Sequence, residues 1–424
     1  MMATCSSFIW LEPIDLWLIS PKSEIKVTPD DFSWLSSCVE VTSFITGLPS
    51  GFLADRFGRK ILLLSTGPFC FLPWLLAFFT RDLASLYIVR ILQGIAEGVC
   101  FAVGPTYLAE ISSPDIRGTL GGHMVVLMYL GFLFIFMPES PYYYLMKNKR
   151  EEAHRSLKWL RGGDDVTTEL DDIEESVVND MKRKGNWKDL FATKSDRRAF
   201  LIVQIVNIAA YMTGVPTVSM YASQTFATTP LHWITADQMT ILMGVILCVS
   251  SLLASFVTDT VGKRILLIIS SVGITVSNIA ICIYYFLAEK TNVQVEQMPW
   301  ILFVGILGLC LMTNVGVGQL VHIIQGEFFP SHTRSIGGGV TTAIATVAIF
   351  VSVKLYQPLS DLSGVYLNFL SYAVISFIAT ILMLLYVNES TGKTLAQINQ
   401  DIDNIISNNN NNNTNNKHLT LEGK

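Results

Sequence analysis

The stretch GFLADRFGRK, residues 51–60, places a charged segment between two long apolar runs. A similar segment, DTVGKR at 259–264, also lies between apolar runs, in the second half of the chain. Each consists of Asp-x-x-Gly followed by two cations. The glycines, Gly58 and Gly262, permit a tight turn between helices, and cations on such short links favour the cytoplasmic side of a membrane. We therefore predict that the two segments are equivalent turns at one face of a bilayer.

The composition is typical of a membrane protein. Of the 424 residues, 51% are hydrophobic and 15% are charged, whereas soluble domains carry about 25% charged residues. The net charge of −5 offers no basic surface to nucleic acid. The seven cysteines are isolated, and the sequence has no metal-ligand spacing, phosphate-binding loop or nucleophile–base cluster. We therefore expect neither enzyme activity nor a metal or cofactor.

Ten apolar runs are long enough to cross a bilayer, which takes about 20 residues per helix. They cover residues 33–53, 61–80, 84–107, 118–137, 200–226, 237–257, 265–288, 299–324, 336–359 and 364–387. Each is expected to be helical, because an open strand leaves backbone groups unpaired in lipid. The predicted fold class is an all-α, polytopic transmembrane helix bundle.

Polar stretches divide the chain into five predicted parts. The stretch at 147–198 holds 13 of the 29 lysines and arginines, which favours a cytoplasmic position. The predicted parts are an N-terminal segment with the remnant of a first helix (1–32), an incomplete N-terminal bundle (33–146), a cytoplasmic helical linker domain (147–199), a C-terminal six-helix bundle (200–390) and a disordered, Asn-rich cytoplasmic tail (391–424).

Three markers recur in the same order in both halves, which indicates two structural repeats. After each Asp-x-x-Gly segment comes a glutamate with an arginine seven positions on and a proline between them, and each half closes on PESP (138–141) or NEST (388–391). We predict a cytoplasmic gate of weak ion pairs between the bundles, each contributing about 1 kcal/mol or less. The alternative is that these charges only anchor the topology. The candidate gate and loop residues are Asp55, Gly58, Arg59, Arg90, Glu110, Arg117, Asp259, Gly262, Arg264, Glu327 and Arg334.

Arg90 is a special case, because it lies inside a predicted span. A cation there is costly and is usually paired or functional. Glu97, about two turns further on, is a candidate to share its face of the helix. The alternative is that Arg90 extends toward the nearer membrane surface.

These motifs resemble the sugar-porter branch of the major facilitator superfamily, over residues 33–400. The two Asp-x-x-Gly segments are similar to the family's loop signature, and the stretch 105–162 is similar to that of insect facilitated trehalose transporters. The resemblance implies twelve helices and alternating access. It also implies an integral protein of the plasma membrane that carries a hexose or disaccharide by facilitated diffusion, without nucleotide hydrolysis. The partners would be a small polar solute and the lipid bilayer.

The chain departs from the family pattern, with about ten of the twelve helices. Glu139 follows Arg117 by 22 positions, whereas Glu389 follows Arg334 by 55, so one helix and its connection are absent from the first half. A single helix at 118–137 would separate two basic segments that both belong inside. Either the C-terminal half is inverted, or this run turns back within the membrane, or the chain is a splice form or an incomplete gene product.

The family's paired glutamines are also replaced, with Ala210 and Tyr211 in their place. The substrate-pocket candidates that remain are Gly214, kept from the family motif, and the polar residues Thr213, Asn314, Gln319 and His322. Sugar hydroxyls need hydrogen-bonding partners when they are buried, and these replacements remove several of the partners that the family pattern supplies. The alternative function is a non-transporting membrane regulator or sensor.

Overall fold

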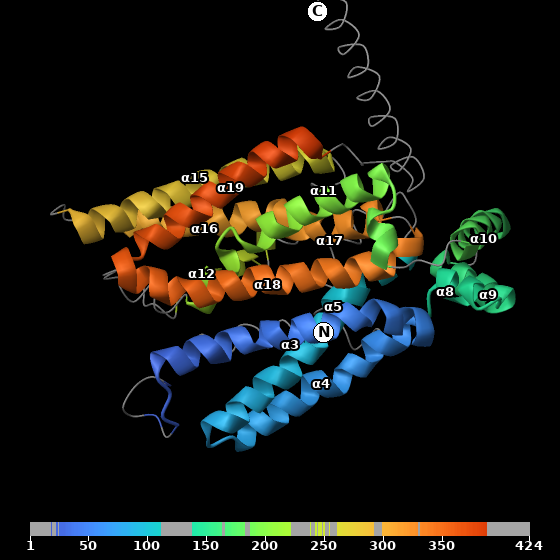
Figure 1. Cartoon of the computed structure of the whole chain (residues 1–424), viewed down its shortest axis with the longest axis horizontal. Helices are drawn as coiled ribbons and strands as arrows, with labels where there is room; N and C mark the ends of the chain where they lie inside the picture. Colours follow the sequence, from blue (N-terminus) through green and yellow to red (C-terminus); the bar gives the residue numbers. More distant parts are fainter. Residues whose placement is uncertain are drawn as a thin grey trace, which may run out of the picture.

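The computed structural model describes residues 25–111, 138–162, 166–182, 187–221, 261–291, 299–329 and 331–387, with Leu18, Ser23 and a few residues between 238 and 254. All regular structure in these ranges is helical (Figure 1). The N-terminal helices are α3 (Pro29–Phe57), α4 (Arg59–Phe79) and α5 (Leu83–Ile111). The middle of the chain forms α8 (Pro141–Met146), α9 (Arg150–Leu160), α10 (Thr167–Lys182) and the 3-10 helix η4 (Trp187–Phe191). The C-terminal helices are α11 (Lys194–Tyr211), α12 (Val215–Met220), α15 (Lys263–Lys290), α16 (Pro299–Val315), α17 (Val317–Phe328), α18 (Ser331–Ser363) and α19 (Tyr366–Tyr386).

The outer surface of the bundle is apolar, as a bilayer requires. Seven helical segments of the described chain are long and apolar enough to cross a membrane. On α4, Phe71, Phe78 and Phe79 are 67%, 82% and 69% exposed. Such contiguous apolar exposure is unfavourable in water and favourable against lipid. The prediction of an all-α transmembrane bundle is confirmed.

Two of the predicted spans are broken helices. The run at 200–226 divides into α11 and α12 around Gly214, whose φ is 98°. The run at 299–324 divides into α16 and α17 at Gly316. A broken helix exposes backbone polar groups, and inside a membrane protein such breaks occur where protein or a polar cavity can satisfy them. The run at 118–137, more than half of 237–257, most of 1–24 and the tail from 388 lie outside the described residues.

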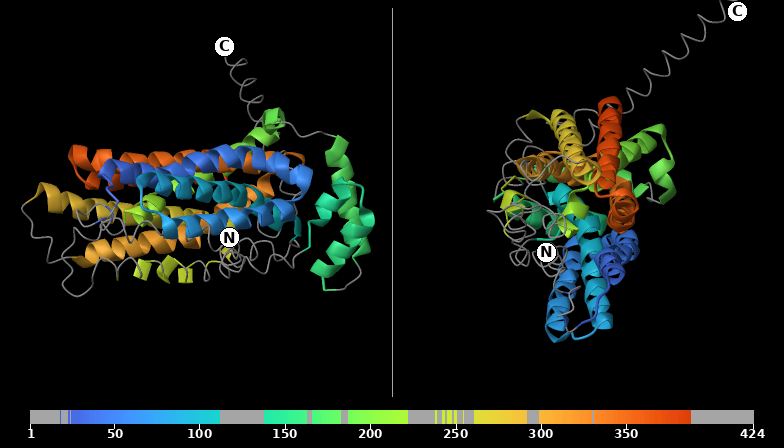
Figure 2. Two further views of the ribbon diagram at one scale, coloured as in Figure 1. Left: turned by 90° about the horizontal axis from the view of Figure 1, so that it is seen from below. Right: turned by 90° about the vertical axis from the view of Figure 1, so that its left-hand side faces the viewer.

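The membrane helices form two halves. Viewed end-on in the right panel of Figure 2, α3, α4 and α5 lie on one side and the C-terminal helices on the other. The closest approach between the halves is that of α3 and α18, which lie side by side along much of their length. Glycines permit this approach: a Cβ on Gly51 would lie 2.2 Å from the carbonyl oxygen of Ser335.

The middle helices form a small unit at one end of the bundle (Figure 2). Helices α8, α9 and α10 enclose their own apolar cluster, which includes Ala153, Leu157, Leu170 and Val177. The membrane helices carry separate apolar clusters. The polar stretch of the sequence therefore folds as an appendage to one end of the membrane bundle.

Candidate functional site

The glycines of the two Asp-x-x-Gly segments adopt similar positive φ angles, each directly before a helix. Gly58 has a φ of 103° and precedes α4, and Gly262 has a φ of 95° and precedes α15. These angles are unfavourable for any residue with a Cβ. Asp259 lies outside the described residues. We call the end of the molecule that carries Gly58 the turn end.

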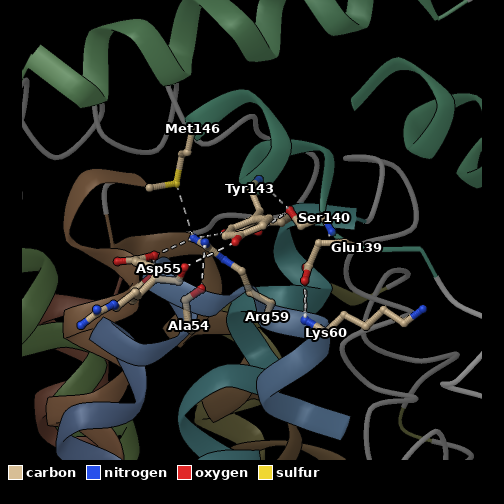
Figure 3. A network of polar contacts seen from close by, with 11 residues as sticks. Ala54, Asp55, Arg59, Lys60, Glu139, Ser140, Tyr143 and Met146 are labelled. Carbon is tan, nitrogen blue, oxygen red and sulfur yellow. Dashed lines mark hydrogen bonds and ion pairs between the residues drawn. The ribbon is translucent and has the colours of Figure 1, made fainter. Parts of the chain in front are cut away.

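Arg59 is the centre of a buried network at the turn end (Figure 3). Its side chain is 2% exposed, and its Nη2 atom lies 2.8 Å from Asp55 Oδ1 and 3.1 Å from Glu110 Oε1. The guanidinium carbon also lies 5.6 Å from the centre of the Tyr143 ring. Three helices of the first half, α3, α4 and α5, are thereby joined through one cation.

Glu139 and Ser140 complete this network, and the sequence analysis did not select them as site residues. The Lys60 backbone N–H donates to Glu139 Oε2 at 3.0 Å, so the carboxylate caps the start of α4. The Ser140 hydroxyl donates to Glu110. The PESP marker at 138–141 was the available signal, since the similar marker NEST closes the second half.

The second half also has a buried ion pair at its turn, and its cation is a residue that the sequence analysis did not select. Lys263 Nζ lies 2.6 Å from Glu327 Oε1, with both side chains buried. The predicted residue Arg264 instead donates to the backbone carbonyl of Leu384 at 3.1 Å. The equivalent of Arg59 is therefore Lys263, because each directly follows the turn glycine and points back into its own half.

The predicted ion pairs between the bundles take a different form. Glu110 and Glu327 each pair with a cation of their own half, the first residue of α4 and of α15 respectively. Among the described residues at the turn end, the halves are joined by a hydrogen bond of 3.0 Å from the Ser335 hydroxyl to Asp55. Arg334 is buried, and its charge acts on Glu110. Arg117 lies outside the described residues.

The same contacts contradict the inverted orientation of the C-terminal half. Ser335, near the start of α18, meets Asp55 at the turn end. Glu327, at the end of α17, holds Lys263 at the start of α15. Both glycine turns therefore lie at the same end of the molecule. An inverted C-terminal half would place them at opposite ends.

Arg90 lies away from the turn end, although the sequence analysis grouped it with the gate and loop residues. It occupies the first third of α5, 20 residues or about 30 Å of helix from Glu110. It is 0% exposed, and its guanidinium donates to the carbonyls of Leu35 (3.0 Å) and Ser36 (3.3 Å) and to Gln93 (3.2 Å). The alternative in which it extends to the membrane surface is wrong, since its donors are bonded within α3 and α5.

The substrate-pocket candidates lie on several helices of the C-terminal half. Thr213 and Gly214 lie at the α11–α12 break, where the Thr213 carbonyl accepts from Asn278 and Gly214 faces the ring of Tyr372. Asn314 donates to the Leu247 carbonyl at 2.9 Å. These three are engaged within the C-terminal half, and Gln319 is buried there on α17.

His322 is the candidate that meets the other half. Its ring stacks on Phe101 of α5, with ring centres 5.5 Å apart. A polar group that the sequence analysis missed joins α11 to α18: Gln204 donates to the Thr341 hydroxyl at 2.9 Å, and Asn207 donates to the Thr341 carbonyl at 3.0 Å. Their spacing of three residues on one helix face was the available signal.

Comparison with known proteins identifies relatives along the whole membrane region. The profile of the Sugar (and other) transporter family matches residues 123–402, and that of the Major Facilitator Superfamily matches residues 3–142. The facilitated trehalose transporter Tret1 of Bombyx mori is 24% identical over 408 residues, covering 89% of this chain and 80% of the relative. The sugar transporter ERD6-like 6 of Arabidopsis thaliana is 26% identical over 415 residues, covering 88% and 83%. A longer relative, Tret1 of Drosophila willistoni, is covered over 47% of its length.

Solved structures show the same fold. The major facilitator proton:xylose symporter XylE, bound to 6-bromo-6-deoxy-D-glucose, superposes with a TM-score of 0.76 at 19% identity, covering 94% of this chain and 97% of XylE. An inward-open structure of XylE from E. coli gives a TM-score of 0.65 at 18% identity.

Proposed function

The chain belongs to the Sugar (and other) transporter family, and from that premise we propose that it carries a sugar across the plasma membrane by alternating access. In this cycle the two helical halves rock against one another, and a small polar solute between them is exposed to one side at a time. Transport would be facilitative, driven by the solute gradient. The relatives that carry trehalose suggest a hexose or a disaccharide as the solute.

The arrangement of bonds at the turn end carries this proposal. Each half is stabilised by its own buried ion pair, Arg59 with Glu110 and Lys263 with Glu327. Breaking such a pair costs about 3–5 kcal/mol. The Ser335–Asp55 bond between the halves is a single hydrogen bond to a partly exposed carboxylate, which contributes about 1.5–3 kcal/mol at most. The halves can therefore separate at this end while each remains intact.

Polar groups of the C-terminal half offer partners for a solute. His322 stacks on Phe101 of α5, and the α11–α12 break and the Gln204–Asn207–Thr341 group lie along α18, which packs on α3 and α5. Broken helices in transporters present backbone groups to bound solutes. A sugar ring needs several such partners to offset the loss of water from its hydroxyls.

The test is solute uptake into liposomes that contain the purified full-length chain. We expect labelled glucose or trehalose to equilibrate faster than in empty liposomes, and excess unlabelled sugar to inhibit the uptake. A matched control is the variant Gln204→Ala with Asn207→Ala, which removes two amide partners while both turn-end ion pairs stay in place. Uptake no faster than in empty liposomes, by correctly inserted protein, would reject transport of these sugars.

One observation favours a non-transporting membrane protein as the second candidate. The Ile111 carbonyl accepts from Arg161 at 3.1 Å, and the Pro138 carbonyl accepts from Tyr107. The chain therefore leaves α5 and returns at the same end with only residues 112–137 between. Two helical crossings take about 40 residues, so the 26 available are too few. The uptake experiment distinguishes the two candidates.

A further inference from the structure

A polar group lies inside the C-terminal half, at the break between α11 and α12. Asn278 of α15 is 0% exposed, and its side-chain N–H donates to the Thr213 carbonyl at 3.1 Å. Helix α15 packs on α16, α17 and α19, and the right panel of Figure 2 shows it on the side of this half away from α3, α4 and α5. Asn278 therefore meets the break from the side that faces away from the N-terminal half.

Tyr372 of α19 meets the break at the next residue. A Cβ on Gly214 would lie 2.5 Å from Tyr372 Cδ2, so the ring covers this glycine directly. The Tyr372 side chain is 4% exposed. Its hydroxyl lies near Thr217 and Ser352, but the hydroxyls of those two residues bond to one another at 2.6 Å. Asn278 and Tyr372 thus approach adjacent residues of the break from two different helices.

Two buried polar atoms of this group form no hydrogen bond within the described chain, namely Oδ1 of Asn278 and the hydroxyl oxygen of Tyr372. The orientation of the Asn278 amide is fixed, because only its NH₂ group can donate to the Thr213 carbonyl. Its oxygen therefore points elsewhere. A buried acceptor that meets no donor is unfavourable, and such groups in native proteins are commonly satisfied by ordered water.

The break itself supplies both donors and acceptors. The Met212 N–H bonds back to the Ile208 carbonyl at 2.9 Å, and the Val218 N–H bonds to the Gly214 carbonyl at 2.8 Å. Between these two bonds, the last carbonyls of α11 and the N–H groups that follow them have no partner within their own helix. At membrane depth such groups must be satisfied by other protein groups or by water.

The chemistry of these groups selects a small neutral ligand that both donates and accepts hydrogen bonds. Asn278 Oδ1 requires a donor, so an anion does not suit it. A cation would face the N–H groups of the break, and none of the groups named here is a carboxylate that could balance its charge. Water meets both requirements with two O–H donors and two lone pairs, and buried waters typically bind about three polar groups.

We propose that the α11–α12 break holds an ordered water molecule, bound to Asn278 Oδ1 and to backbone groups of the break beside Tyr372. The water stabilises the broken helix at membrane depth, because it completes hydrogen bonds that the two helical segments cannot make with one another. Asn278 contributes by holding this water and the Thr213 carbonyl. The site does not depend on the proposed transport function, and its test uses no solute.

The test is X-ray footprinting of the purified full-length chain in detergent. X-rays convert water in place into hydroxyl radicals, which oxidise adjacent side chains, and mass spectrometry measures the oxidation of each residue. We expect Tyr372 to be oxidised several-fold faster than Phe328, a ring of the same half that is 1% exposed and lies in its apolar cluster. Asn278→Leu keeps the size of the side chain and removes the acceptor, so it should lower the oxidation of Tyr372 to the rate of Phe328.

The matched control is Thr275→Val, one turn from Asn278 on α15, because the Thr275 hydroxyl donates to the Ser271 carbonyl of its own helix at 2.9 Å. Tyr372 should be oxidised there as in the native chain. Oxidation of Tyr372 no faster than that of Phe328 in the native chain overturns the water site, and so does fast oxidation that persists in Asn278→Leu. The native comparison needs no variant, so it decides the proposal if the leucine variant does not fold. Absence of sugar uptake in liposomes would reject the transport function and leave the footprinting result standing.

Discussion

At the scale of single residues, the contrast between Arg59 and Lys60 tests the turn-end network. Arg59→Gln leaves the Glu110 carboxylate buried beside Asp55 without its cation. We expect a loss of about 3 kcal/mol in the free energy of unfolding, seen as a lower midpoint in thermal or denaturant unfolding in detergent. Lys60→Gln is the neighbouring control, because Lys60 bonds Glu139 through its backbone N–H. It should change the stability by no more than about 0.5 kcal/mol.

The residue scale also shows where sequence reasoning stops. The turn glycines, Asp55, Arg59 and Glu110 were predictable, because they repeat at fixed spacing. The choice of Arg264 over Lys263 was not resolvable from charge alone, since both are cations and only the direction of the first residue of α15 separates them. Arg90 was recognised as unusual, but its partners are α3 carbonyls, which no side-chain pattern reveals.

At the scale of elements, the α3–α18 contact depends on small residues. A Cβ on Gly51 would lie 2.2 Å from the Ser335 carbonyl oxygen, so Gly51→Ala forces the two helices apart at the turn end. Overpacking of this kind costs about 1–3 kcal/mol, which favours the conformation open at this end. In a cysteine-free background, Ala102→Cys, buried beside Gly338, should react several-fold faster with a water-soluble thiol reagent.

The control for this experiment is Gly67→Ala on α4. A Cβ there meets nothing within 4 Å, so the same chemical change leaves the helix contacts unaltered. Reactivity at position 102 should then match that of the parent chain. Equal reactivity in the Gly51 and Gly67 variants would show that the α3–α18 contact does not govern opening at the turn end.

The elements themselves were largely predictable, because membrane helices are long apolar runs. The predicted runs at 61–80 and 265–288 match α4 and α15 to within a few residues. The helix breaks near Gly214 and Gly316 were not predictable, since apolar sequence continues through both. Gly214 adopts its positive φ against the ring of Tyr372, a contact made between helices distant in sequence.

At the scale of the whole molecule, a different set of contacts joins the two halves at the end opposite the turn end. Lys354 of α18 lies 3.2 Å from Asp30 Oδ1 and 4.2 Å from the centre of the Trp34 ring, both on α3. These contacts are partly exposed, so together they contribute about 1 kcal/mol. An apolar cluster that includes Phe32, Tyr221 and Tyr356 lies beside them. Both ends of the α3–α18 contact are therefore closed in this conformation.

If the halves rock as rigid units, weakening the contacts at one end must lower the population of the state that is open at the other end. The two open states compete for the same molecules. Lys354→Gln should expose Ile349, a buried residue of the apolar cluster, so that Ile349→Cys reacts about five-fold faster, as 1 kcal/mol implies. Ala102→Cys at the turn end should react more slowly in the same background. Lys290→Gln is the matched control, since Lys290 lies over Tyr366 within one half. Faster reaction at both reporters would indicate general loosening of the bundle and would reject rigid-body rocking.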